Sequence, residues 1–575
     1  MKIKNIKTIL LVIIIAAVTL AYASSFDGVF LFDDHSQITG NEKISSLSWP
    51  WAFMENVRRP VLYLSLALNY AWGQEKVFGY HLFNLAVHGI AALFLFGCIS
   101  RTYQNAKHEE REPREGMWMA FVVALVWAVH PLQTESVTYI VQRVESLMGM
   151  FFFMALYFAI RYMQQRQFIW LMISTVACLL GGLTKEVMLA APCVVILYDR
   201  VFVSASFKEA FTKHKKLYAG LALTWVVMLF LFFTTQPEET PTAGFSFKGI
   251  SPWLYAFNQP PVILHYLKLV FWPASLVFDY EWLPAQSLGV LWAYMPGTAA
   301  ILFFLIKDFK NRSVSSFLGL SFFIILAPSS SFIPLKDLAF EHRMYVPLAC
   351  VVLLVMIGVR NIFWKILKDS MVSDIFTVVL ALAIAGPLGF KTYQRNKDYY
   401  SEVGMWKDVV VKRPFNSRAN NNYGRYLLEK GKVKEARQFY ERAIQLNPEY
   451  ADAHLNMGSL LAQTGRTEEG IAYTQRAIDI DPGYAIAYNN LGAAYADKGE
   501  YEKAIGFYHQ ALDLDFKDVG VYHNLGVALA RTGRPYEAIE NIEKALALNP
   551  DFQAAKEHLK EIKGNLQRLG DSEQP

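Results

Sequence analysis

Residues 451–484 read ADAHLNMGSLLAQTGRTEEGIAYTQRAIDIDPGY, and this pattern recurs with a fixed period near the C-terminal end of the chain. Its central glycine returns every 34 residues, as Gly424, Gly458, Gly492 and Gly526. A period of 34 residues is typical of stacked helix–turn–helix units. Such units bury a core between neighbours and expose a concave face that can hold an extended partner. The sequence therefore predicts an α-solenoid at this end.

Other positions keep the same period. Small residues recur where the two helices of a unit should cross closely and again within the second helix, at Ala436, Gly470, Ala504 and Ala538, and at Ala443, Ala477, Ala511 and Ala545. Proline closes three units, at Pro448, Pro482 and Pro550, and Phe516 takes its place in the third unit. Together these positions predict four tetratricopeptide repeats, at 417–450, 451–484, 485–518 and 519–552, with a capping helix that completes the region 417–569.

Asparagines lie early in the first helix of each repeat, on the face that lines the groove. They are Asn421, Asn456, Asn490 and Asn524. Repeated amides there predict hydrogen bonds to the backbone of a bound protein or peptide. A generic scaffold or a dimer contact is an equally weighted alternative, because a fold does not determine a function.

The chain before about residue 395 is a series of long apolar runs. Hydrophobic residues make up 54% of the sequence and charged residues 18%, which is too apolar for a purely soluble protein. Runs suited to spanning a bilayer lie near residues 8–23, 82–100, 117–130, 147–162, 168–184, 187–203, 217–235, 289–306, 314–333, 345–359 and 372–390. We therefore expect an all-α fold, with a polytopic membrane domain of about eleven spans at 1–395 and a linker at 396–416 before the repeats.

Basic residues predict the orientation of these spans. The N-terminal lysines and the later clusters of Lys and Arg fall on every second connection, which is the positive-inside pattern. The first run can be a cleaved signal peptide or a retained span, and either leaves Ser24 onward outside the cytoplasm. We expect it to be retained, and an odd number of spans then puts the repeats outside the cytoplasm. The expected location is a cell inner membrane with periplasmic repeats. Residues 253–278 are read as amphipathic helix at the outer interface, and the parity would flip if they spanned the bilayer.

Composition argues against several classes of function. The net charge of +5 is spread over many loops, without a basic stripe interleaved with aromatic residues, so a nucleic-acid partner is not expected. The four cysteines lie inside apolar runs and form no CxxC pair, which argues against a zinc ribbon or a disulfide-stapled domain.

The first outer loop carries adjacent carboxylates, Asp33 and Asp34. Such a pair can supply a general base, because one carboxylate raises the pKa of the other. It can also hold a divalent cation through oxygen ligands, so a cation at Asp33 and Asp34 is a possible cofactor, although no metal site is assigned. The alternative is a helix N-cap, for which Asp is well suited.

Further charged and polar residues gather in the predicted outer loops, where positive charge should be scarce. The basic ones are Arg59, Arg143, Lys185 and Arg343, and the others are His81, Glu135, Glu186, Glu341 and Tyr345. Guanidinium groups pair bidentately with phosphate oxygens, so the basic set suits a lipid-linked phosphate. Ion pairing among the loops and snorkelling to headgroups are the structural alternatives.

Several short motifs in these loops occur in an order that resembles the TMTC family of membrane O-mannosyltransferases. They are Phe32-Asp33-Asp34, Arg59-Pro60-Val61, Leu68-Asn69-Tyr70, Phe78-Gly79-Tyr80-His81-Leu82-Phe83-Asn84, His130-Pro131, Thr134-Glu135-Ser136, Gln142-Arg143, Lys185-Glu186 and Glu341-His342-Arg343-Met344-Tyr345-Val346-Pro347. A membrane domain followed by tetratricopeptide repeats is also the layout of that family. The resemblance covers nearly the whole chain. The array is shorter than in eukaryotic relatives, which suggests a bacterial homologue.

The resemblance implies a GT-C type glycosyltransferase that uses a polyprenyl-phosphate sugar as donor. By this analogy Asp33 or Asp34 would activate an acceptor hydroxyl, and Arg343, Arg143 or Lys185 would neutralise the departing lipid phosphate. The repeats would hold a protein acceptor. Two alternatives remain open: a non-enzymatic membrane scaffold that organises an export or surface-polysaccharide machine, and sugar transfer onto a lipid or growing glycan.

Overall fold

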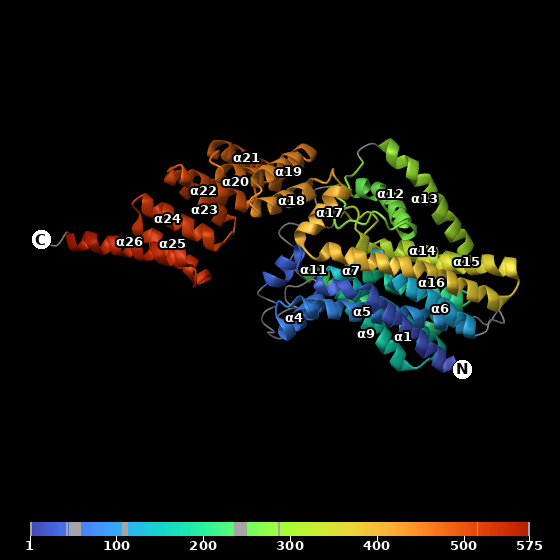
Figure 1. The fold of residues 1–575 in the computed structure, drawn as a ribbon. Helices are drawn as coiled ribbons and strands as arrows, with labels where there is room; N and C mark the ends of the chain where they lie inside the picture. The colour runs from blue at the N-terminus through green and yellow to red at the C-terminus, as the bar shows by residue number, and fades with distance from the viewer. Residues whose placement is uncertain are drawn as a thin grey trace. The chain divides into compact units, whose positions relative to one another are not determined.

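The computed structural model describes residues 3–41, 44, 59–105, 113–234, 250–285, 288–514 and 516–572. These residues form helices and connecting loops, with no β-strand among them (Figure 1). The chain divides into two compact units, Met1–Asp408 and Val409–Pro575. The predicted all-α class, a membrane-type helical domain followed by a tetratricopeptide solenoid, is confirmed.

The first unit contains long helices joined by short helical turns. The long ones are α1 (Ile3–Ala21), α4 (Pro60–Gly73), α5 (Val77–Asn105), α6 (Pro113–Ala128), α8 (Arg143–Gln165), α9 (Phe168–Gly182), α11 (Phe207–Thr234), α12 (Pro252–Phe271), α13 (Leu288–Phe309), α14 (Val314–Leu326), α15 (Pro347–Leu367) and α16 (Ser370–Arg395). The shorter ones are η1 (Ala23–Asp27), η2 (His35–Thr39), η3 (Pro131–Gln133), α7 (Thr134–Thr138), η4 (Glu186–Leu189), α10 (Ala190–Tyr198), η5 (Asp199–Val203), η6 (Glu341–Met344), η7 (Asn396–Tyr399) and α17 (Glu402–Lys412).

Within the described residues, five helices are long and apolar enough to cross a membrane, which indicates a multi-pass membrane protein. They are Asn5–Asp27, Val77–Gln104, Arg143–Gln165, Pro347–Leu367 and Ser370–Tyr399. A sixth candidate is bent by 58° between Glu115–Ala128 and Pro131–Thr138. The predicted count of about eleven is not confirmed. The runs near 168–184 and 314–333, for example, form helices of only 15 and 13 residues, short of the roughly 20 that a span needs.

The residues left open as spanning or interfacial, 253–278, contain α12. It is not one of the five span candidates, and Pro260 and Pro261 lie inside it. Its Trp253 is exposed, whereas Asn258 is buried. The segment 396–416, assigned from sequence to a linker, contains η7 and α17.

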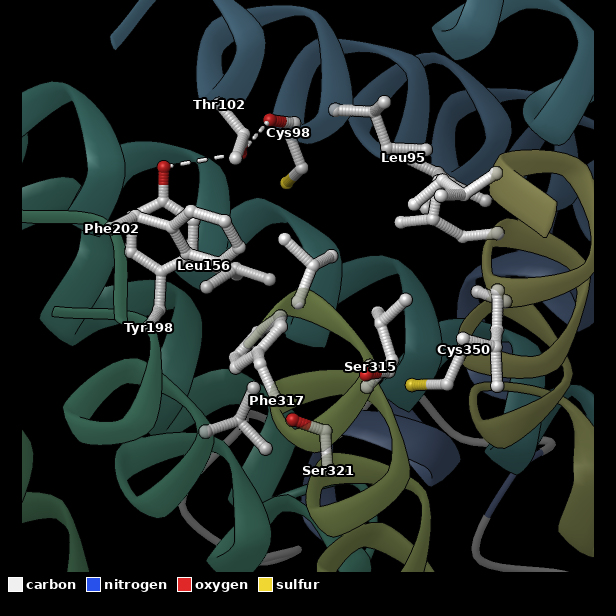
Figure 2. A pocket seen from close by; sticks show the side chains of 18 of the residues that line it. Leu95, Cys98, Thr102, Leu156, Tyr198, Phe202, Ser315, Phe317, Ser321 and Cys350 are labelled. Carbon is white, nitrogen blue, oxygen red and sulfur yellow. Dashed lines mark hydrogen bonds between the residues drawn. The ribbon is translucent and has the colours of Figure 1, made fainter. Parts of the chain in front are cut away.

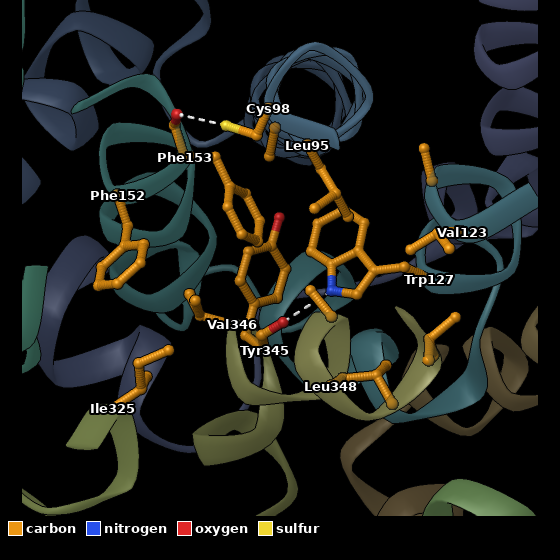
Figure 3. Packing of buried hydrophobic residues seen from close by; sticks show 14 of the residues in the cluster. Leu95, Cys98, Val123, Trp127, Phe152, Phe153, Ile325, Tyr345, Val346 and Leu348 are labelled. Atoms are coloured by element: carbon orange, nitrogen blue, oxygen red, sulfur yellow. Dashed lines mark hydrogen bonds between the residues drawn. The ribbon is translucent and has the colours of Figure 1, made fainter. Parts of the chain in front are cut away.

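The core of the first unit packs directly beneath the outer loops. Trp127 of α6 is fully buried and donates from Nε1 to the carbonyl oxygen of Tyr345 at 2.9 Å (Figure 3). The Tyr345 hydroxyl lies 2.8 Å from Nδ1 of His88 on α5. A Cβ atom at Gly149 of α8 would lie 2.4 Å from the Tyr345 ring, so only glycine lets the two segments approach this closely. Tyr345, predicted to support the site, therefore anchors η6 in the core.

The second unit consists of helix pairs. They are α18 (Ser417–Glu429) with α19 (Val433–Leu446), α20 (Ala451–Gln463) with α21 (Thr467–Ile480), α22 (Ala485–Asp497) with α23 (Tyr501–Asp513), and α24 (Val519–Arg531) with α25 (Pro535–Leu548), followed by α26 (Gln553–Ser572). The turn inside each pair contains a glycine with positive φ, such as Gly465 at +81°. This left-handed conformation ends the first helix of the pair without the steric cost of a Cβ.

Candidate functional site

The two adjacent carboxylates of the loop after α1, Asp33 and Asp34, lie in different environments. Asp34 is fully buried, and its two carboxylate oxygens accept backbone N–H bonds from Leu31 at 3.0 Å and from Val141 at 2.8 Å. Burial raises the pKa of Asp34 to about 8, although the two backbone bonds act to lower it. Asp33 is exposed. Asp34 thus holds the loop against the connection between α7 and α8, and Asp33 is the carboxylate that a substrate can reach.

Tyr139 fixes the backbone of this loop. Its hydroxyl oxygen accepts the N–H of Asp33 at 2.9 Å, and its ring meets the ring of Phe278 edge-on at a centroid distance of 5.0 Å. The side chain of Asn84 on α5 donates to the carbonyl oxygens of Val137 and Ile140 on either side of Tyr139. Neither Tyr139 nor Asn84 stands out in the sequence as a site residue, because their partners are distant along the chain.

A buried chain of charged and polar groups connects α7, η6, α8 and the start of η4. His342 donates its backbone N–H to Glu135 at 3.0 Å, and its Nδ1 lies 2.7 Å from the same carboxylate. Its Nε2 is 3.7 Å from Oε1 of Glu145, which pairs with Nζ of Lys185 at 2.5 Å. Burial lowers the pKa of His342 to about 3, despite the opposing charge of Glu145, so the imidazole is neutral at physiological pH.

Glu341 lies beside this chain and faces a residue that the sequence did not single out, Arg395. Glu341 is fully buried, and its Oε1 accepts from the backbone of Val277 at 2.6 Å and from the Tyr280 hydroxyl at 2.7 Å. Its Oε2 is 4.0 Å from Nη2 of Arg395. Burial raises the pKa of Glu341 to about 7, although Arg395 acts to lower it. Arg395 also pairs with Asp398 at 2.8 Å and Asp408 at 3.3 Å.

Two of the predicted phosphate-binding arginines use their guanidinium groups within the protein. Buried Arg143 donates to neutral acceptors on α4 and α5, among them Oδ1 of Asn69 at 2.6 Å. Arg343 donates to carbonyl oxygens of the loop before η6, those of Ser329, Leu338 and Asp337, at 2.6 to 3.1 Å. Both arginines therefore hold neighbouring segments in place.

The other two predicted cations are more accessible. Arg59 lies 3.5 Å from Glu186, and both side chains are about half exposed, at 41% and 54%. Burial would raise the pKa of Glu186, but the charges of Arg59 and Lys185 lower it overall. Lys185 is only 12% exposed. His81 is buried at the start of α5, with Nε2 2.9 Å from where a Cβ of Gly28 would lie, so it packs beneath the loop.

An apolar cavity of about 470 Å³ lies among α5, α8, α10, α14 and α15 (Figure 2). Phe152, Leu156 and Phe317 are among the residues that line it, and Thr102, Ser315 and Arg360 are polar ones. Two lining residues, Ile325 and Val346, also line a small pocket that contains Glu145 and Arg343. The apolar cavity therefore adjoins the buried charged groups.

The described residues contain no group of three or more His, Cys, Asp or Glu side chains arranged to hold a metal ion. A cation at Asp33 and Asp34 stays a prediction.

The asparagines of the repeats bond partly to their neighbours. Asn456 donates to Oδ1 of Asn421 at 2.9 Å, and Asn490 donates to the Ser459 hydroxyl at 3.0 Å. Oδ1 of Asn524 lies 3.3 Å from a ring nitrogen of His523. Asn421 is buried, and the other three are half-buried. The bonds donated by Asn456 and Asn490 link successive repeats, and the side chains of Asn456, Asn490 and Asn524 remain partly accessible.

Comparison with known proteins supports both halves of the sequence analysis. Residues 427–495, 485–518 and 519–552 match the tetratricopeptide repeat. The chain is 26% identical over 463 residues to a protein O-mannosyl-transferase of Caenorhabditis elegans, covering 76% of this chain and 63% of the relative. It is 22% identical over 514 residues to the human protein O-mannosyl-transferase TMTC1, covering 76% of this chain and 54% of the relative.

The resemblance to the TMTC proteins is thus confirmed, and the chain spans 54–63% of the length of these two relatives. Among solved structures, a tetratricopeptide protein of Thermus thermophilus is 21% identical, with a TM-score of 0.26, and the match covers 29% of this chain and 90% of that protein.

Proposed function

We propose that this protein is an integral membrane glycosyltransferase of the GT-C type, which moves a sugar from a polyprenyl-phosphate donor to a protein acceptor on the extracytoplasmic side. The relatives, which match about three quarters of this chain, are named protein O-mannosyl-transferases, and this supports the transfer of a sugar to a protein. A bacterial inner membrane with periplasmic repeats is the location that the charge pattern of the loops favours.

The observation that carries the proposal is the continuity between an apolar cavity and a charged cluster. A polyprenyl chain needs an apolar groove, and the phosphate and sugar at its end need cations and hydrogen-bonding groups. The cavity between α8, α14 and α15 supplies the first, and the pocket with Glu145 and Arg343, beside Lys185, supplies the second. Because Ile325 and Val346 line both, the head of a donor whose chain occupies the apolar cavity would lie beside the charged pocket, which at about 10 Å³ would have to widen to admit it.

In the proposed reaction, the exposed carboxylate of Asp33 accepts the proton of an acceptor hydroxyl. The hydroxyl oxygen forms a bond to the anomeric carbon of the sugar, and the bond between that carbon and the phosphate oxygen breaks. The electron pair stays on the departing polyprenyl phosphate. Asp34 holds the loop, so the two carboxylates divide the roles of base and support.

Lys185 and Arg59 are the proposed partners of the departing phosphate. Lys185 pairs with Glu145 and Arg59 with Glu186, and both side chains carry several N–H donors of the kind that bind phosphate oxygens. Arg143 and Arg343 position the surrounding helices and loops through neutral acceptors. Removing a single hydrogen-bond donor that stabilises developing negative charge in an active site raises the activation free energy by about 3–4 kcal/mol.

The repeats are proposed to bind the protein acceptor along their concave face. Asn456, Asn490 and Asn524 retain accessible surface, and the link from Asn456 to Asn421 fixes the spacing of the first two repeats. An Asn490→Ala variant is expected to raise KM for a protein acceptor and to leave the KM for the lipid donor unchanged. A membrane-impermeant maleimide should label Lys556→Cys in intact spheroplasts if the repeats are periplasmic.

The experiment that tests the proposal is transfer of radiolabelled mannose from polyprenyl-phosphate mannose by the purified full-length protein, with extracytoplasmic proteins and lipid acceptors supplied side by side. Asp33→Asn should lower transfer by about 10²–10⁴-fold, the usual contribution of a general base. Glu75→Gln, at an exposed carboxylate in the turn between α4 and α5, is the control for loss of a surface charge. Chelation with EDTA in the same assay tests a divalent cation.

Three outcomes would overturn parts of the proposal. Full activity of Asp33→Asn would remove the assignment of the base. Transfer to lipid alone would replace the protein acceptor. If no sugar is transferred, and if cellular function survives Asp33→Asn but fails in Asn490→Ala, a non-enzymatic scaffold becomes the better explanation.

A further inference from the structure

The acidic loop is held in an unfavourable backbone conformation at the residue before Asp33. Phe32 has φ of +43°, in the left-handed region that residues with a Cβ rarely adopt. Such a conformation persists only when surrounding contacts determine it. The contacts that hold Phe32 therefore also decide where the Asp33 carboxylate lies.

Trp406 of α17 is one of the two aromatic residues against which Phe32 packs. The Phe32 ring meets the Trp406 indole edge-on at a centroid distance of 5.5 Å and the Phe278 ring at 6.2 Å. Phe278 and Trp406 are themselves 5.7 Å apart, so the three rings form a closed triangle. Trp406 is only 1% exposed, and it fills this space completely.

The residues just before Trp406 hold the same loop at further points. Nε2 of His35 lies 3.9 Å from the carboxylate of Glu402, and the Tyr400 hydroxyl donates to Asp27 at 3.2 Å. The backbone N–H of Val29 donates to the carbonyl oxygen of Tyr399 at 3.3 Å. Residues 399–406 thus contact both sides of Asp33 along the loop.

The same helix continues into the repeat unit. The first compact unit ends at Asp408, whereas α17 runs without a break to Lys412. Asp408 is itself paired with Arg395 at 3.3 Å. The helix that supports the acidic loop is therefore also the chain segment through which the repeats are attached.

We infer that Trp406 is a positioning residue for Asp33. It packs against Phe32 and thereby keeps that residue of the acidic loop in its left-handed backbone conformation. Trp406 lies on the helix that leads into the repeats. The link to sugar transfer rests on the proposed function, in which Asp33 is the base. The positioning itself is a statement about the loop and can be measured without any substrate.

Amide hydrogen exchange in the full-length protein in detergent provides that measurement. The amides of Leu31, Asp33 and Asp34 bond to Asp34, to Tyr139 and to the Leu31 carbonyl, respectively. In Trp406→Ala these three amides should exchange at least tenfold faster than in the wild type. Trp406→Phe keeps an aromatic ring and should restore most of the protection. Trp253→Ala, at an exposed tryptophan of α12, is the matched control and should match the wild type.

Helix α8, which lies in the same compact unit as the acidic loop, reports whether the first unit of a variant is folded. If Trp406→Ala speeds amide exchange throughout the first unit, that variant has lost its fold and Trp406→Phe is used instead. Amide exchange in Trp406→Phe that is intermediate in rate and confined to residues 29–35 supports the inference. Wild-type protection of 29–35 in a folded Trp406→Ala, or in Trp406→Phe if Trp406→Ala does not fold, would overturn it.

The transfer assay separates this inference from the proposed function. If both hold, Trp406→Ala lowers kcat at least tenfold with KM for the lipid donor unchanged, and Trp406→Phe recovers activity. If Asp33→Asn stops transfer but Trp406→Ala affects neither exchange nor kcat, the inference fails and the proposed function stands. If Asp33→Asn remains fully active, the role of the base fails, and the exchange data still test the positioning.

Discussion

The two compact units differ in where their ion pairs lie. In the repeats, pairs lie on the surface and many join residues three or four apart, such as Arg466 with Glu469 at 2.5 Å. In the first unit, several pairs are buried and join distant parts of the chain, such as Lys185 with Glu145 at 2.5 Å and Arg395 with Glu341 at 4.0 Å. Exposed pairs contribute little to stability, whereas burying charges is costly unless they are paired.

The difference indicates where function resides. Periodic apolar contacts between helices can stabilise a repeat array, so its surface charges can change with little effect on stability. The first unit keeps Glu135, Glu145, Glu341 and Arg395 at low exposure, although apolar side chains would be cheaper to bury. Costly buried charges that converge beside a cavity are expected at sites of chemistry.

The largest effect on stability is expected when one buried carboxylate is removed. Glu145→Ala should destabilise the first unit by about 3–5 kcal/mol, because Lys185 and His342 lose their shared partner in a buried environment. The measurement is thermal denaturation of the purified protein in detergent. A change no larger than that of a surface pair would show that the buried network is not a structural requirement.

The pH dependence of the stability of the first unit provides a second test of the difference between the units. The pKa of Asp34 is raised from 3.8 to about 8. At a pH between these two values, the folded state therefore keeps a proton on Asp34 that the unfolded state has released. Its contribution to stability is complete below the unfolded pKa and is lost as pH rises through the folded pKa.

The Asp34→Asn variant lacks this titration. The stability of the wild type relative to Asp34→Asn should therefore fall by up to about 1.4 kcal/mol per pH unit, or about 3 kcal/mol between pH 5 and pH 7. Melting of both proteins across this range gives the difference, which cancels the other titrating groups. A constant difference would mean that Asp34 is ionised throughout.

Glycine substitutions test the repeats, with a smaller expected effect. A Cβ at Gly458 would lie 2.8 Å from the carbonyl oxygen of Gly470, so Gly458→Ala should destabilise the repeat unit by about 1–3 kcal/mol. At Gly506, no described atom lies within 4 Å of a new Cβ, and Gly506→Ala should stabilise by about 0.4–1 kcal/mol. Pulse proteolysis in urea, following the repeat fragment, measures both, and equal effects would contradict the crossing geometry.

The smallest effect is expected at a surface pair of the repeats. Glu469→Ala removes the partner of Arg466 and should change the stability of the repeat unit less than either glycine substitution, with a still smaller effect at high salt. The same urea assay at two salt concentrations checks this. A loss as large as that of Glu145→Ala would abolish the contrast between the units.

The sequence predicted the repeats well because their contacts are local. The period of 34 residues requires the same side chains at each helix crossing, so Gly458 and Gly470 can be recognised without a structure. The span count was predicted less well. The run near 187–203, for example, is apolar apart from Asp199 and Arg200 but is divided among η4, α10 and η5.

The candidate site was predicted in part. The motifs around Asp33, Lys185 and Glu341 pointed to the segments that converge, but Arg395, Tyr139 and Trp406 carried no signal. A buried arginine at the end of a long apolar helix resembles any cytoplasmic or interfacial anchor in sequence. Only its approach to Glu341, at 4.0 Å, distinguishes it.

By itself, then, the sequence determined the helical class, the apolar helices and the repeat array, because hydrophobicity and period act over a few residues at a time. The tertiary structure decided which of two adjacent aspartates is buried and which is exposed, since Asp34 finds the backbone N–H of Val141 107 residues away. It also decided that Arg143 and Arg343 bond to neutral acceptors, that Lys185 pairs with Glu145 in a largely buried position, and that Arg59 is partly exposed. Burial and long-range hydrogen bonds set these roles, and neither is encoded in local spacing.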